Sequence, residues 1–241
     1  MSRAFKMVGD PLDTGEKLFT KKEFAFNPGV TVLVGCNGTG KTTLLRCIKE
    51  QLKNDGIPVI SYDNLSEGGS RAMSSASYFE DYTFVATAAT SSEGENIVLN
   101  LGRLASSLRP FIQTGEPQNR SDKLAKAFAR AVWGDDTEES KKEIPKERWL
   151  LFDAIDSGLS VDNIVDVKEH LFRVILEDAG DCDIYILVSA NEYEIARGEN
   201  CFDVRNGKYI TFKDYEAYRE FILESREKKD ARIRKAAEKR W

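Results

Sequence analysis

Residues 35–42 constrain this chain most, because they combine three glycines, a lysine and a threonine at fixed spacing. The segment is Gly-Cys-Asn-Gly-Thr-Gly-Lys-Thr and fits the pattern GxxxxGK[ST] in full. An apolar run at 30–34 precedes it, and apolar residues at helical spacing follow from about Thr42. The sequence therefore predicts a buried strand, a glycine-rich loop and a helix in this order, which is the arrangement that cradles phosphate groups.

Each part of this loop has a physical role in binding a nucleoside triphosphate. Glycines let the backbone curl so that successive N–H groups point at the phosphates, and the helix that follows adds its positive N-terminus. We expect Lys41 to reach the β- and γ-phosphates and the Thr42 hydroxyl to bind Mg²⁺. A chance glycine loop is the alternative, which the flanking strand and helix disfavour. The predicted cofactors are ATP and Mg, and the predicted ligands in the loop are Gly35, Cys36, Asn37, Gly38, Thr39, Gly40, Lys41, Thr42 and Thr43.

A second element of the same chemistry follows at 149–153, where four apolar residues end in Asp153. An acid at the end of a buried strand can hold the water shell of Mg²⁺, so Asp153 joins Thr42 as a predicted metal ligand. Asp156 lies three residues further on and is a candidate base, which completes a predicted catalytic set of Lys41, Asp153 and Asp156. A carboxylate in such a loop is more often a turn cap, and this alternative stays open.

Two further segments resemble motifs of the ABC ATPases. Asp-Ser-Gly-Leu-Ser at 156–160 is similar to the family's D-loop, and Ser-Glu-Gly-Glu-Asn at 92–96 is similar to its signature. The resemblance covers roughly 30–207 and is closest to SMC, RecF and RecN-like DNA-maintenance proteins and to small phage-type ATPases. It implies an ATP-dependent homodimer in which Ser92, Gly94 and Glu95 contact the nucleotide of the partner. A helix-capping box of Ser92 with Glu95 is the alternative.

Three positions depart from the ABC pattern. Ala154 stands where the family places its catalytic glutamate, Asn191 where it places a switch histidine, and Asp63 or Asn64 where it places a glutamine. We still expect Asn64 and Asn191 to line the nucleotide. The departures leave two hypotheses open, a slow ATPase in DNA maintenance or phage–host conflict and a non-catalytic, ATP-gated clamp.

Other nucleotide-binding classes fit less well. A small-molecule kinase has no use for the Ser92 segment, and a GTPase would need an NKxD motif that the sequence lacks. Fewer than thirty residues separate Asp63 from Ser92, which is too few for the coiled-coil arms of SMC proteins.

Apolar runs alternate with amphipathic stretches, so the predicted fold class is α/β, a P-loop NTPase. We expect a mainly parallel sheet with helices on both faces and a small antiparallel β region within 4–26. Strands are predicted at 57–62, 149–152 and 184–188, a helix capped by Ser160 at 161–179, and a hairpin around Asn206 and Gly207. The predicted domains are an ATP-binding domain at 1–213, with a helical part inserted at about 64–134, and a charged helix at 214–241.

Composition and charge narrow the location and the partners. No apolar run approaches the ~20 residues of a membrane span, and no signal peptide is evident, so we expect a cytoplasmic protein without a membrane partner. Four cysteines without metal-ligand spacing fit reduced thiols.

Charge is concentrated at the C-terminus. Residues 225–241 contain eight Lys/Arg against three Asp/Glu, a balance of +5, which leaves −10 for the rest of a chain of net charge −5. This helix is a candidate contact for nucleic acid, and a solvated, frayed terminal helix is the alternative. A second protein subunit is a further candidate partner. Phe5, Phe19 and Phe24 are candidates for an adenine platform or for core packing.

Overall fold

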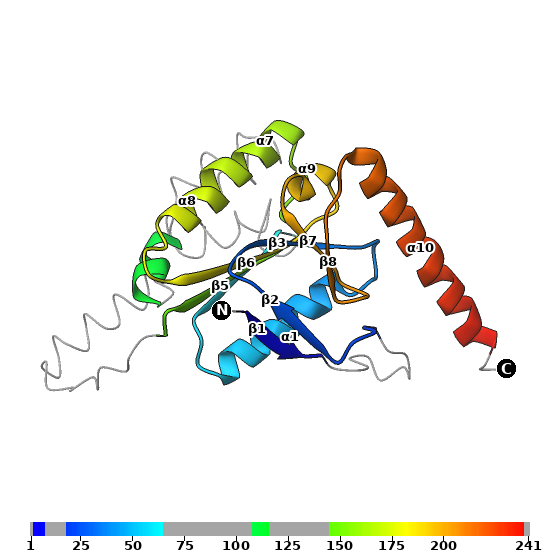
Figure 1. Cartoon of the computed structure of the whole chain (residues 1–241), viewed down its shortest axis with the longest axis horizontal. Helices are drawn as coiled ribbons and strands as arrows, with labels where there is room; N and C mark the ends of the chain where they lie inside the picture. Colours follow the sequence, from blue (N-terminus) through cyan, green and yellow to red (C-terminus); the bar gives the residue numbers. More distant parts are fainter. Residues whose placement is uncertain (1, 8–17, 65–107, 116–144, 239–241) are drawn as a thin grey trace, which may run out of the picture.

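The computed structural model describes residues 2–7, 18–64, 108–115 and 145–238, and its centre is a six-stranded sheet (Figure 1). The strand order is β4-β5-β6-β3-β7-β8, and every neighbouring pair is parallel except β7 with β8. The strands are β3 (Gly29–Val34), β4 (Val59–Asp63), β5 (Glu147–Asp153), β6 (Asp183–Ser189), β7 (Asn200–Asp203) and β8 (Lys208–Ile210). The predicted α/β class, the three predicted strands and the hairpin at Asn206 and Gly207 are confirmed.

The helices lie on both faces of this sheet. The helix α1 (Lys41–Asn54) covers one face, while α7 (Val161–Asp166), the π-helical turn η1 (Val167–Phe172) and α8 (Arg173–Glu177) form one continuous rod on the other. A short helix at 108–114 adds Leu108 and Phe111 to that second face. Two further helices follow β6 and β8, namely α9 (Tyr193–Ala196) and α10 (Tyr215–Glu238).

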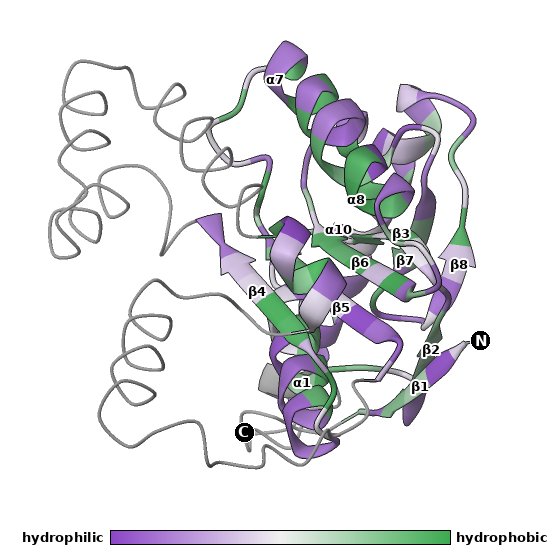
Figure 2. Ribbon diagram, turned by 90° about the vertical axis from the view of Figure 1, so that its left-hand side faces the viewer, coloured by the Kyte–Doolittle hydropathy of each residue, from purple (hydrophilic) through white to green (hydrophobic). Residues whose placement is uncertain are grey.

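The sheet has two buried faces because side chains alternate along each strand. In β5, Trp149 and Leu151 pack toward α1, while Leu150 and Phe152 pack toward the α7–α8 rod. Around the turns of α1, α7 and α8 hydrophilic and hydrophobic residues alternate, as expected for helices with one buried side (Figure 2). The two hydrophobic layers hold the carboxyl ends of the parallel strands in fixed positions.

The predicted antiparallel β region is confirmed as a separate two-stranded sheet of β1 (Arg3–Lys6) and β2 (Glu23–Phe26). Aromatic contacts fasten it to the main sheet, since the Phe5 ring meets Trp149 edge-on at 5.0 Å and Trp149 stacks on Tyr185 at 4.1 Å. Phe5, Phe19 and Phe24 are each at most 4% exposed. Core packing is therefore their role, and the adenine-platform hypothesis for them is wrong.

Some boundaries and caps differ from the predictions. The rod on the second face ends at Glu177 rather than 179. Ser160 occupies the predicted N-cap position of α7, but its side chain makes no hydrogen bond to the helix backbone. Its hydroxyl instead bonds the Asp162 carboxylate and holds the pKa of that group below its ordinary value.

The helix predicted from about 214 is confirmed as α10, which begins at Tyr215. Most of the predicted helical insertion at 64–134 lies outside the described residues, so the domain limits stay predictions. Within the part of the chain that the structure describes, no helix combines the length and the apolar character needed to cross a membrane.

Candidate functional site

The glycine-rich loop joins the carboxyl end of β3 to the first turn of α1, as the sequence predicts. Gly35 has a φ of 146°, and a Cβ on it would lie only 2.7 Å from Thr39 Oγ1. Thr39 is buried and donates its hydroxyl to the Cys36 carbonyl at 2.8 Å, so it closes the curl from inside. Gly40, with a φ of 99°, precedes α1, and a Cβ there would lie 2.6 Å from Leu18 Cδ2. Only glycine fits either position without strain.

Lys41 lies inside this curl. Its side chain is 9% exposed, and Nζ donates to the Gly35 carbonyl at 2.8 Å and to Asn191 Oδ1 at 3.1 Å. Burial lowers the pKa of Lys41 below its ordinary value of 10.5, and the nearby Cys36 and Asp156 partly oppose this shift. No carboxylate among the described residues forms an ion pair with Lys41. The lysine is therefore a partly desolvated cation whose hydrogen-bond acceptors are neutral. Replacing these acceptors with an anion would be favourable.

Thr42, the residue after Lys41, lines a second cavity of about 200 Å³ together with Asp153. Ser189, at the end of β6, donates its hydroxyl to Asp153 Oδ1 and accepts the Ala154 N–H at 3.0 Å, so it orients both residues. A hydroxyl and a carboxylate are hard oxygen donors of the kind that Mg²⁺ prefers. The described residues contain no cluster of three or more His, Cys, Asp or Glu, so an ion held here would need phosphate oxygens or water as further ligands.

The turn after β5 is under backbone strain. Ala154 has a φ of 52° and is the one non-glycine residue with positive φ in the described segments. Asn64 holds the turn, since its Nδ2 donates to the carbonyls of Ala154 at 3.2 Å and Ser157 at 2.7 Å, while Tyr62 donates to its Oδ1. Asn64 was predicted as a nucleotide ligand, but it is 6% exposed and these bonds give it a structural role.

Asp156 has the contacts of a turn cap. Its Oδ2 accepts the backbone N–H groups of Asn191 and Glu192, both at 2.6 Å, and the residue is 3% exposed. Its Oδ1 is buried without a hydrogen-bond partner among the described residues. The alternative that the sequence left open, a capping role, is therefore the one these contacts favour.

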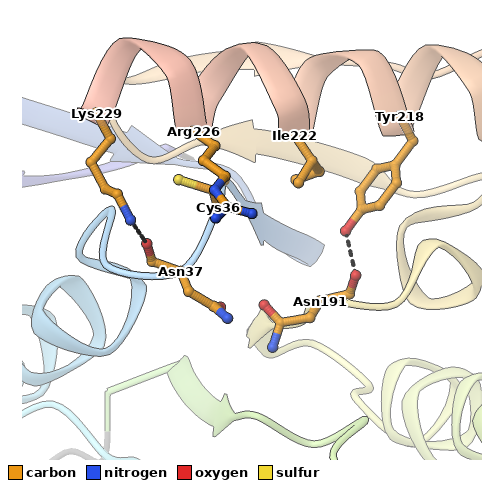
Figure 3. A pocket seen from close by; sticks show the side chains of 8 residues that line it. Cys36, Asn37, Asn191, Tyr218, Ile222, Arg226 and Lys229 are labelled. Atoms are coloured by element: carbon orange, nitrogen blue, oxygen red, sulfur yellow. Dashed lines mark hydrogen bonds between the residues drawn. The ribbon is translucent and has the colours of Figure 1, made fainter. Parts of the chain in front are cut away.

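Sequence reasoning missed that α10 packs against the phosphate loop. Tyr218 donates its hydroxyl to the Asn191 carbonyl at 2.7 Å, and Lys229 Nζ donates to the Asn37 carbonyl at 2.9 Å (Figure 3). Ser225 Oγ also accepts the Cys36 N–H at 3.3 Å. Residues 218–229 of the helix therefore contact the body of the protein, while most of residues 231–235 are exposed, as the alternative of a solvated helix predicts for that part. Apolar residues at helical spacing in its first half, Tyr218, Phe221 and Ile222, were the available signal.

The structure thus gathers most predicted site residues at the carboxyl ends of β3, β5 and β6, where ligands bind in open α/β sheets. The predicted signature residues Ser92, Gly94 and Glu95 lie outside the described residues.

Comparison with known proteins gives one finding of similarity. A family model described as an AAA domain matches residues 17–56, which contain β2, β3, the phosphate loop and α1. None of the curated proteins compared with the chain matches it. The parallel sheet, the loop around Lys41 and this match together support a P-loop, nucleotide-binding ATPase, at the level of that broad superfamily.

Proposed function

We propose that this protein binds Mg-ATP in the 35–42 loop, hydrolyses it slowly and dimerises around it. One observation carries the proposal: Lys41 is a buried cation whose contacts on one side, Gly35 and Asn191, line a cavity of about 460 Å³. The next residue, Thr42, lines the second cavity together with Asp153. A polyphosphate chain placed at Lys41 would therefore have loop amides on one side and metal-binding oxygens on the other.

The roles of the residues follow from this placement. In the free protein Lys41 Nζ is bound to two neutral oxygens, and binding of a triphosphate exchanges these for phosphate oxygens. Such charge-assisted hydrogen bonds are worth about 1.5–3 kcal/mol each. Thr42 and Asp153 are the residues that would hold Mg²⁺, which supplies charge neutralisation on the phosphates. Ser189 keeps the Asp153 carboxylate oriented toward that position.

Slow turnover is expected because the described turn after β5 offers no suitable base. Ala154 has no functional group, and one oxygen of Asp156 is already bound to two backbone amides. Neither residue offers the freely placed carboxylate that orients an attacking water. The same observation favours a second candidate function, an ATP-gated binding module without turnover. Phosphate release that stays at background for the parent and for Asp153→Asn would support the module, while release abolished by Asp153→Asn would support the enzyme.

Binding is tested by isothermal titration of Mg-ATP into the parent protein and into Lys41→Ala. Loss of one charge-assisted contact predicts affinity weakened by roughly 10- to 150-fold. Lys53→Ala is the matched control, because Lys53 is an exposed lysine at the other end of α1. Equal affinities for the parent and Lys41→Ala would refute nucleotide binding at this loop.

The homodimer rests on the resemblance of the Ser92 segment to the ABC signature. Light scattering with saturating Mg-ATP tests it, and a monomer under those conditions would refute it. A role in DNA maintenance or phage–host conflict rests on the same resemblance. Nucleic acid is a second proposed partner, because the exposed side of α10 carries Arg234 and Lys235 near its end. Binding of DNA that weakens steeply with salt, and weakens further when both residues are replaced, is the expected result.

A further inference from the structure

The larger cavity of the site is closed on one side by α10. Four side chains at helical spacing, Tyr218, Ile222, Arg226 and Lys229, point from one side of this helix toward the phosphate loop (Figure 3). The opposite wall is formed by Gly35, Cys36, Asn37 and Asn191. The end of the chain that carries excess positive charge therefore faces the element that is built to hold phosphate.

Arg226 and Lys229, the two cations of this wall, have no strong competing partner among the residues that the structure describes. Lys229 Nζ is bound to the neutral Asn37 carbonyl at 2.9 Å, and its side chain would lie 3.8 Å from a Cβ placed on Gly38. Arg226 contacts a carboxylate only loosely, with Nε 3.9 Å from Asp230 Oδ2, and its side chain is 72% exposed. Both groups are free to turn toward an anion in the cavity at little cost.

The position of the cavity indicates which phosphate they would meet. Lys41 is the residue expected at the β- and γ-phosphates, and both of its hydrogen-bond acceptors line this cavity. The metal-binding residues Thr42 and Asp153 line the other cavity instead. An anion that extends past Lys41 into the α10 cavity is therefore the terminal phosphate of a triphosphate, which a diphosphate lacks.

We propose that α10 is a cationic lid of the nucleotide site, and that Arg226 and Lys229 bind the terminal phosphate from the side opposite the metal. The proposal rests on the proposed function, nucleotide binding at the 35–42 loop. Through these two side chains the protein would bind a nucleoside triphosphate more tightly than a diphosphate. Lys229 exchanges the Asn37 carbonyl for a phosphate oxygen, while Tyr218 keeps the helix attached to Asn191.

The test is isothermal titration of Mg-ATP and Mg-ADP into the full chain and into the double variant Arg226→Gln/Lys229→Gln. Two charge-assisted contacts at a partly exposed site predict ATP affinity weakened by about 10- to 50-fold. The ADP affinity is expected to change by less than about threefold, because the diphosphate does not reach α10. Lys228→Gln is the matched control, since Lys228 is the neighbouring lysine on the same helix and is bound to Glu224 at 2.8 Å.

The possible outcomes separate this inference from the proposed function. Loss of ATP affinity in the double variant, with ADP binding, melting temperature and Lys228→Gln all near the parent, supports the lid. Equal losses for ATP and ADP would overturn it, as would tighter ATP binding, which would mean that α10 blocks the site. If Lys41→Ala loses ATP and the double variant does not, the lid alone fails. If the parent binds no ATP, both proposals fail.

Discussion

Replacing Ala154 with glycine is expected to stabilise the protein, although it removes a side chain next to the metal-binding Asp153. The φ of Ala154 is 52°, and an L-residue with a Cβ in that region costs about 1–2 kcal/mol. Glycine adopts this conformation freely, but it costs about 0.5–1 kcal/mol in lost chain entropy on folding. The difference predicts an increase of about 0.5–1 kcal/mol in the free energy of unfolding.

Urea unfolding of the nucleotide-free protein measures this change, with an expected rise in melting temperature of about 1–4 °C in a parallel thermal experiment. Ala25→Gly is the control, because Ala25 is an exposed residue of β2 with an ordinary negative φ. That variant should be destabilised by about 0.5–1 kcal/mol. The reasoning is refuted if Ala154→Gly loses as much stability as Ala25→Gly, since the turn would then carry no strain.

Three further predictions concern the residues around this turn and the loop. Asn64→Ala should cost about 1 kcal/mol in urea unfolding, because the carbonyls of Ala154 and Ser157 lose a partly buried donor. A cost no larger than that of the exposed Asn54→Ala would contradict the role given to Asn64. Gly40→Ala should lower the melting temperature, since its φ of 99° and the approach to Leu18 are both unfavourable for a side chain, and an unchanged calorimetric transition would count against it. The lowered pKa of Lys41 means that the free protein releases this proton below the pH of an ordinary lysine, while a bound anion restores it. In the alkaline range below pH 10.5, ATP binding should therefore take up protons and weaken as pH rises. Titration in two buffers of different ionisation enthalpy would show this uptake, and the same uptake in Lys41→Arg would assign it to another group.

The fold was predictable from the sequence because its strands are short, nearly continuous apolar runs that end in recognisable loops. The runs at 30–34, 149–152 and 184–188 are buried on both faces of the sheet, so they are almost continuously apolar. A surface helix would instead mix apolar and polar residues. The phosphate loop was predictable for another reason. Its glycines have φ values and close contacts that suit no other residue. The positions of the glycines in the sequence therefore indicate the backbone conformation of the loop.

The placement of α10 and the role of Asn64 were not predictable in the same way. The charge of α10 is visible in the sequence, but its contacts with Cys36 and Asn37 join residues 189 and 192 positions apart. Asn64 follows a strand, where nucleotide ligands are common, and only the three-dimensional position of the 154–157 turn shows that its carboxamide is used internally. Long-range hydrogen bonds of this kind leave no periodic signal.

The strand β6 lies between β3 and β5. The strand that leads into the phosphate loop and the strand that ends in Asp153 are therefore not neighbours. The last residue of β6 and the residues just after it span this gap. Ser189 reaches Asp153, Asn191 reaches Lys41, and the backbone of Asn191 bonds to both Asp156 and Tyr218. A small sliding of this one strand would consequently disturb the lysine, the acid and the last helix at once. Substitutions within β6, at Ile186 or Val188, are therefore expected to displace Lys41, Asp153 and α10 together, although neither residue lies at the site.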